Sequence, residues 1–164
     1  MTSTRRIPRS GEVGVTVPAP ADAVWRVLSD VTRTGEWSHE CHQVRWLGAA
    51  TAARPGTRFR GRNRSGWMRW SRVCEILAVD PPRELVWRTL ATPTLPDSTE
   101  WRIRLEPDAS GTRIVQSYQV TKLPRWLELL LAMVNPSHRD RTQALAQDLQ
   151  RLGEIAAPSA SRHR

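Results

Sequence analysis

The sequence predicts an α+β protein in which one curved antiparallel β-sheet wraps around a long C-terminal helix. Residues 126–157 have helical periodicity, and in their second half Leu145, Leu149, Leu152 and Ala156 form one apolar stripe. Most of the preceding chain shows strand-like alternation, and the short joins between consecutive strands favour antiparallel pairing. Because an amphipathic helix must bury its apolar stripe, we expect the sheet to curl around this helix.

The C-terminal helix is predicted to consist of two pieces. Residues 126–134, from Trp126 to Val134, are apolar nearly all round but are far fewer than the ~20 residues that span a bilayer. We interpret this piece as a lid or cavity wall, with a transient membrane contact as the alternative. Pro136 should end it and Ser137 should cap the second piece. In that second piece Asp148 is predicted to lie on the solvated face.

The chain begins with a strand and two short helices. Residues 11–17 alternate with valine at every second position, which predicts the first strand. Pro20 suits the first turn of a helix, predicted at residues 21–29. Asp30 can cap a second short helix that follows directly.

Six further strands follow. The joins between them are rich in Gly, Pro, Asn and Asp, which is turn chemistry. The predicted strands are residues 40–47, 57–63, 68–79, 84–90, 98–106 and 112–121.

The chain of 164 residues is most simply one domain at residues 11–156, with a flexible N-terminus at 1–10 and a tail at 157–164. No apolar run follows Met1, so we expect no signal peptide and a cytoplasmic protein. Cys41 and Cys74 should then be reduced thiols.

The formal net charge of +9 raises the question of nucleic-acid binding. Most arginines are dispersed along the chain, and only Arg58, Arg60, Arg62 and Arg64 form a row, on one face of a predicted strand. We expect this row to lie on the outer surface of the sheet and to pair with glutamates of neighbouring strands. This interpretation disfavours nucleic acid as a partner.

Several segments together resemble the START-like superfamily, in its SRPBCC or polyketide cyclase/dehydrase-like branch, which has the helix-grip fold. These segments are VPAPADAVW at residues 17–25, LSD at 28–30, EWS at 36–38, GTRFRG at 56–61, PPREL at 81–85 and GTR at 111–113, followed by the closing helix. The resemblance covers residues 11–156. It implies a seven-stranded antiparallel sheet gripping the last helix, with a deep cavity between them. Relatives bind lipids, hormones, polyketides or other apolar molecules, and a few catalyse cyclisation.

Strand alternation predicts which side chains face that cavity. Phe59 and Asn63 share the face opposite the arginine row, and Gln116 and Tyr118 would supply polar groups from the last strand. The strand at residues 68–79 stays open, because each of its two faces mixes apolar with charged residues. The predicted ligand-binding residues are Trp37, Phe59, Asn63, Trp70, Trp87, Trp101, Gln116 and Tyr118, roofed by Leu127, Leu130, Met133 and Val134. The alternative is that the tryptophans fill a solid core.

Signals for metal binding or catalysis are weak. His39 and Cys41 share one face of a strand while His42 points the other way, and no metal-ligand motif is present, so no metal or other cofactor is predicted. The weak catalytic candidates are Tyr118 with His39 or Glu40 as acid and base. We therefore expect a protein that binds an apolar small molecule. The alternatives are a cyclase- or dehydratase-type enzyme using the same cavity and, third, a basic nucleic-acid binder.

Overall fold

The computed structural model describes residues 7–134 and 141–158 of the chain. The predicted helix break at Pro136 and the cap at Ser137 lie outside the described residues. The elements, in chain order, are β1 (Ser10–Val17), α1 (Ala21–Ser29), the 3₁₀ helix η1 (Val31–Glu36), β2 (Cys41–Trp46), β3 (Arg58–Ser65), β4 (Met68–Asp80), β5 (Glu84–Thr89), β6 (Ser98–Asp108), β7 (Gly111–Lys122), α2 (Arg125–Val134) and α3 (Thr142–Ala156).

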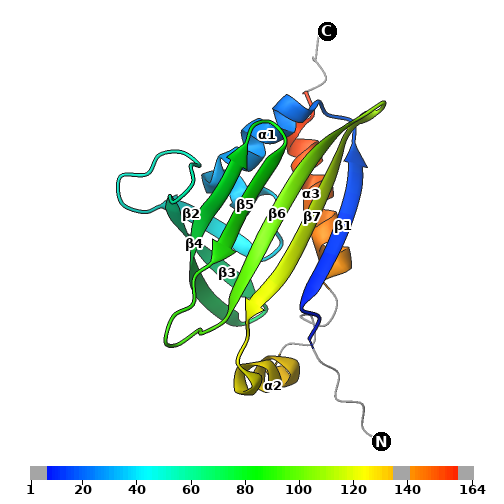
Figure 1. The fold of residues 1–164 in the computed structure, drawn as a ribbon. Helices are drawn as coiled ribbons and strands as arrows, with labels where there is room; N and C mark the ends of the chain where they lie inside the picture. Colours follow the sequence, from blue (N-terminus) through cyan, green and yellow to red (C-terminus); the bar gives the residue numbers. More distant parts are fainter. Residues whose placement is uncertain (1–6, 135–140, 159–164) are drawn as a thin grey trace, which may run out of the picture.

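The strands form one seven-stranded sheet in the order β1-β7-β6-β5-β4-β3-β2, and each neighbouring pair is antiparallel. Figure 1 shows the sheet curving past α3, with α1 near one end and α2 at the other. The predicted α+β fold, with a curved sheet and two short helices after the first strand, is therefore confirmed. β1 begins at Ser10, and the backbone carbonyl of Arg9 accepts a hydrogen bond from the Val120 N–H at 2.7 Å.

The apolar stripe of α3 packs on the inner face of the sheet. Leu149 and Leu152 have no exposed surface, and Leu145 and Ala156 are buried with them. Gly153 of α3 lies directly over Val17 of β1, so the helix and the strand approach closely at this point. The helix therefore rests on the sheet as its spacing predicted.

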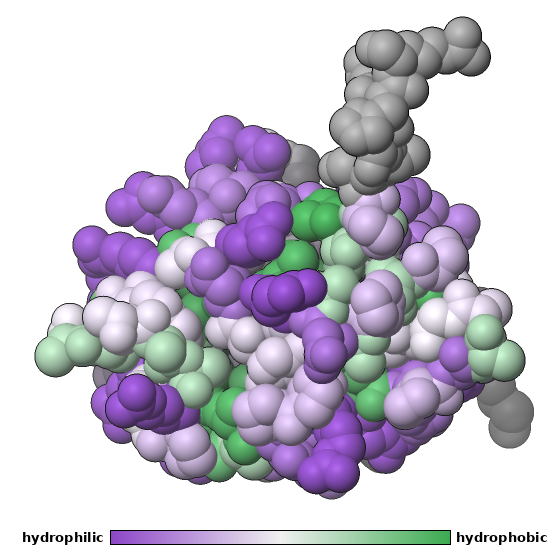
Figure 2. Space-filling view, turned by 90° about the horizontal axis from the view of Figure 1, so that it is seen from above, coloured by the Kyte–Doolittle hydropathy of each residue, from purple (hydrophilic) through white to green (hydrophobic). Residues whose placement is uncertain are grey.

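The outer face of the sheet carries the arginine row. Arg58 donates to Glu75 at 2.9 Å, and Arg88 donates to the same carboxylate at 2.9 Å. Arg102 pairs with Glu84 at 2.9 Å. Within the row itself, Arg58 shows the expected pairing with a glutamate, whereas Arg62 donates to Gln43 at 3.4 Å. Such exposed pairs contribute little to stability individually. Viewed from above, the surface shows hydrophilic side chains interspersed with small hydrophobic areas (Figure 2).

Candidate functional site

A cavity of about 650 Å³ lies between the inner face of the sheet and the helices. α2 forms one wall of its open end, together with the β3–β4 turn and the β5–β6 loop. Among the residues that line it are Trp37, Phe59, Asn63, Trp70, Trp87, Trp101, Gln116 and Leu127, all of which were predicted as ligand-binding residues. The volume falls in the range of about 300–1,000 Å³ that is usual for small-molecule sites.

Aromatic side chains make up much of the cavity wall. The rings of Trp87 and Trp101, which are cross-strand partners on β5 and β6, stack with centroids 6.4 Å apart and an interplanar angle of 14°. Trp37, the residue that directly follows η1, is buried. The wall therefore offers broad, flat apolar surfaces.

The structure decides the inner face of β4, which the sequence left open. Trp70, Arg72 and Cys74 line the cavity, so a charged residue lies on the inner face. Arg72 donates from Nη1 to the Asp97 carboxylate and from Nη2 to the Asp97 carbonyl, each at 2.8 Å. This double contact ties the β5–β6 loop to β4 at the cavity mouth and neutralises the guanidinium.

Four predicted ligand-binding residues lie outside the cavity. The Tyr118 ring packs over Gly11 and lies 5.4 Å from the Trp101 ring. Of these two aromatic residues, only Trp101 lines the cavity. On α2 the roof is made by Leu127 and Leu131. Leu130, Met133 and Val134 are instead exposed to solvent. Helical spacing did not reveal this rotation, because α2 is apolar on nearly every side.

Three buried polar atoms of cavity-lining residues have no hydrogen-bond partner in the described part of the chain. They are the indole nitrogen of Trp37, Nε of Arg72 and Oε1 of Gln116. A buried polar group without a partner costs about 1–3 kcal/mol, so such atoms are expected to bind water or a ligand. The nitrogen atoms of Trp37 and Arg72 are hydrogen-bond donors, and Oε1 of Gln116 is an acceptor.

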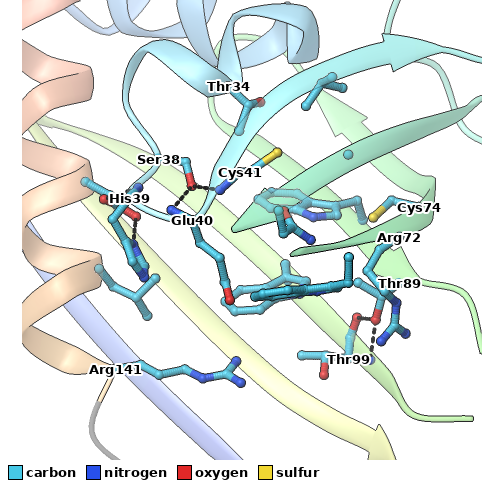
Figure 3. Close-up of a pocket in the computed structure, with 18 of the residues that line it drawn as sticks. Thr34, Ser38, His39, Glu40, Cys41, Arg72, Cys74, Thr89, Thr99 and Arg141 are labelled. Carbon is cyan, nitrogen blue, oxygen red and sulfur yellow. Dashed lines mark hydrogen bonds and ion pairs between the residues drawn. The ribbon is translucent and has the colours of Figure 1, made fainter. Parts of the chain in front are cut away.

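Glu40 extends its carboxyl group into the cavity (Figure 3). The Ser38 hydroxyl accepts hydrogen bonds from the backbone N–H groups of Glu40 and Cys41 at 3.3 and 3.0 Å, which holds the backbone at this point. Burial raises the pKa of the Glu40 carboxyl above its ordinary value, and the nearby Arg141 opposes that shift. The group is thus a carboxyl that holds its proton at higher pH than an exposed glutamate.

His39 is engaged by α3 through Asp148. Its Nδ1 lies 2.6 Å from Asp148 Oδ2, and its backbone N–H donates to Asp148 Oδ1 at 2.9 Å. Arg151 Nη2 also donates to Oδ1, at 2.6 Å. Asp148 is buried, so its placement on the solvated helix face was wrong.

The two cysteines are free thiols. Burial raises the pKa of Cys41 to about 11 and that of Cys74 to about 12. Both therefore stay protonated at neutral pH, which makes them poor nucleophiles and poor metal ligands.

Two further features concern metals and membranes. Within residues 7–134 and 141–158, no three His, Cys, Asp or Glu side chains gather so that they could hold a metal ion. None of the helices described is both long and apolar enough to cross a bilayer.

The sheet, the gripped helix and the internal cavity together define a helix-grip protein. The sequence assigns it more narrowly, because residues 8–150 match the family described as polyketide cyclase / dehydrase and lipid transport. The chain belongs to this family. No significant match is found among curated proteins.

Solved structures with the same fold cover nearly the whole chain. The Zhui aromatase/cyclase from Streptomyces sp. R1128 is 22% identical with a TM-score of 0.66, over 90% of this chain and 93% of that one. The Polyketide_cyc-like protein Cgl2372 from Corynebacterium glutamicum is 24% identical with a TM-score of 0.56, over 94% and 97%. Protein MLL2253 from Mesorhizobium loti is 19% identical with a TM-score of 0.64, over 90% and 96%. These likenesses show a shared fold.

Proposed function

We propose that the protein binds an apolar small molecule, such as a lipid or polyketide, in the cavity between the sheet and α3. The observation that carries this proposal is the cavity of about 650 Å³, with an aromatic wall and with buried polar atoms that have no partner among the residues the structure describes. Apolar walls with a few convergent polar groups are the usual composition of a small-molecule site. The family description, which includes lipid transport, supports the same class of function.

The walls suggest how the molecule would be held. Burial of its surface against the tryptophans supplies most of the affinity, at about 25 cal/mol per Å² before association costs. The Trp37 indole N–H and the Gln116 amide oxygen each need a hydrogen-bond partner, so a ligand with one acceptor and one donor satisfies both. The ligand is therefore expected to be mostly apolar with polar atoms at defined positions.

Replacing Asn63 with tryptophan is expected to weaken binding of the apolar fluorescent probe N-phenyl-1-naphthylamine at least about tenfold, because the added ring occupies the cavity. The measurement is probe fluorescence in a titration with purified protein. Arg62→Trp is the matched control, since it places the same ring on the preceding residue of β3, whose side chain points out to Gln43. Unchanged affinity in Asn63→Trp would place the probe elsewhere and count against the proposal.

A second candidate function, acid–base catalysis in the same cavity, rests on Glu40. Its carboxyl group lies inside the cavity, and burial raises its pKa above that of an ordinary glutamate. A buried carboxyl group beside a bound substrate can act as general acid or base. Tyr118, the other proposed group, packs against Trp101 and does not line the cavity, and His39 Nδ1 is paired with Asp148. Glu40 alone would therefore take an α-proton from a bound β-hydroxyketone and return it to the departing hydroxyl as water forms.

This candidate predicts that the protein accelerates dehydration of 4-hydroxy-4-phenylbutan-2-one to 4-phenylbut-3-en-2-one, followed by ultraviolet absorbance. Glu40→Gln should lower the rate at least about 100-fold while N-phenyl-1-naphthylamine still binds. Glu36→Gln is the control, because Glu36 pairs with Arg33 on the exposed part of η1. Equal rates in the two variants would remove Glu40 from the reaction and leave binding as the function.

A further inference from the structure

Exposed apolar side chains lie on two elements that also line the cavity, the β3–β4 turn and α2. Trp67 in the β3–β4 turn is 86% exposed and Met133 of α2 is 81% exposed. We call the whole cluster the mouth patch. It consists of Trp67, Trp126, Leu129, Leu130, Met133 and Val134, and it contains every large hydrophobic residue found exposed in the described part of the chain. Exposed apolar groups gathered at one site mark an interaction surface.

The mouth patch is continuous with the cavity. α2 contributes Leu127 and Leu131 to the cavity wall, and its other sides carry the exposed residues. Trp67 belongs to both, because it lines the cavity and is also exposed. In Figure 1, α2 lies beyond the end of the sheet, so its outer side faces away from the rest of the molecule. A partner bound to this surface would therefore lie next to the part of the cavity wall formed by α2 and Trp67.

Basic side chains accompany the mouth patch. Arg64, Arg69, Lys122 and Arg125 are exposed residues of the β3–β4 hairpin, the end of β7 and the start of α2. No ion pair to any of these four is seen among the described residues. The acidic Glu128 of α2 is neutralised by Arg9 at 3.0 Å. Asp97 at the same mouth is neutralised by Arg72. The patch therefore presents apolar residues with an excess of positive charge.

We propose that the mouth patch docks on an anionic phospholipid surface. Tryptophan, leucine and methionine on a short helix and a neighbouring turn would enter the headgroup region, while the four basic residues attract acidic lipids. This arrangement fits a bilayer better than a second copy of the chain, because that copy would bring the same positive charges together. In the docked orientation the cavity opens toward the bilayer, so an apolar ligand can move from the bilayer into the cavity, or back, without crossing water. This last step rests on the proposed binding function, whereas docking itself does not.

The test is co-sedimentation with vesicles of phosphatidylcholine alone or of equal parts phosphatidylcholine and phosphatidylglycerol. We expect binding to the mixed vesicles that weakens with added salt, and at least about tenfold weaker binding to the neutral ones. The double variant Leu129→Ser and Met133→Ser should lose at least about tenfold in affinity for mixed vesicles. Both residues are exposed and line no part of the cavity, so probe binding in solution should stay unchanged.

Charge is tested by two matched variants. Lys122→Glu with Arg125→Glu should abolish the preference for mixed vesicles. Arg26→Glu with Arg54→Glu makes the same change in net charge on α1 and the β2–β3 loop, away from α2, and should retain that preference. If both double variants lost the preference for mixed vesicles equally, net charge alone would attract the protein to the vesicles, and the proposed docking site would be overturned. The proposal would also be overturned if the protein did not bind vesicles but self-associated, and if the double serine variant no longer self-associated. That result would assign the mouth patch to contact with a second copy of the chain. Vesicle binding without probe binding would refute only the proposed function.

Discussion

Replacing Asp148 with alanine is expected to lower the free energy of unfolding by about 2–4 kcal/mol. The buried carboxylate accepts hydrogen bonds from the His39 backbone, the His39 ring and Arg151, at 2.6–2.9 Å. Arg151 also donates to the Trp37 carbonyl at 3.1 Å, so the cluster fastens the start of β2 and the end of η1 to α3. The His39 and Arg151 side chains remain 40% and 44% exposed, so water can solvate them and limits the loss.

The contribution of this cluster should depend on pH through His39. The hydrogen bond that the His39 ring donates to Asp148 raises the pKa of that ring above its ordinary value of 6.5. Because the folded-state pKa is the higher one, this contribution is complete below about pH 6.5 and is lost as pH rises through the raised pKa. The difference in unfolding free energy between wild type and His39→Gln should therefore be larger at about pH 5 than at about pH 9.

Urea denaturation followed by circular dichroism measures both effects. Glu154→Ala is the control for Asp148→Ala, because Glu154 is an exposed carboxylate on the same helix, and its loss should change stability by less than about 0.5 kcal/mol. Equal unfolding midpoints for the two alanine variants would show that the buried cluster contributes nothing.

Gly153→Ala is expected to lower the free energy of unfolding by about 1–3 kcal/mol. Helix propensity by itself predicts the opposite sign, a gain of about 1 kcal/mol. The reason is the close packing of α3 on β1, where an added Cβ would meet Val17 Cγ1 and lie 2.5 Å from Val17 Cβ. Val17 is buried, so the strand cannot yield without disturbing the core.

A double-mutant cycle with Val17→Ala tests this packing. Val17→Ala vacates the space that the new methyl group needs, so the double variant should lose less stability than the sum of the two single variants. A Gly153→Ala protein more stable than wild type would mean that helix and strand do not touch as the structure shows. Purely additive effects would lead to the same conclusion.

The architecture could be predicted because it depends on patterns within each element. Alternating valines define β1, and the spacing of Leu145, Leu149 and Leu152 defines the buried stripe of α3. The inward faces of β3 and β6 were also predicted, since their apolar and charged residues alternate cleanly. Phe59 and Trp101 accordingly lie where the alternation placed them.

Local sequence patterns were sufficient to predict the order of elements, the antiparallel sheet, the gripped helix and most of the cavity wall. Tertiary structure alone decided that Arg72 lies inside, that Asp148 is buried, and that α2 turns Leu131 rather than Leu130 toward the cavity. Arg72 pairs with Asp97, 25 residues away, and Asp148 pairs with His39, 109 residues away, as well as with Arg151 on the same helix. The distant contacts bury these two side chains, and no local pattern can reveal them. On α2 both sides are apolar, and periodicity distinguishes faces only where their polarity differs.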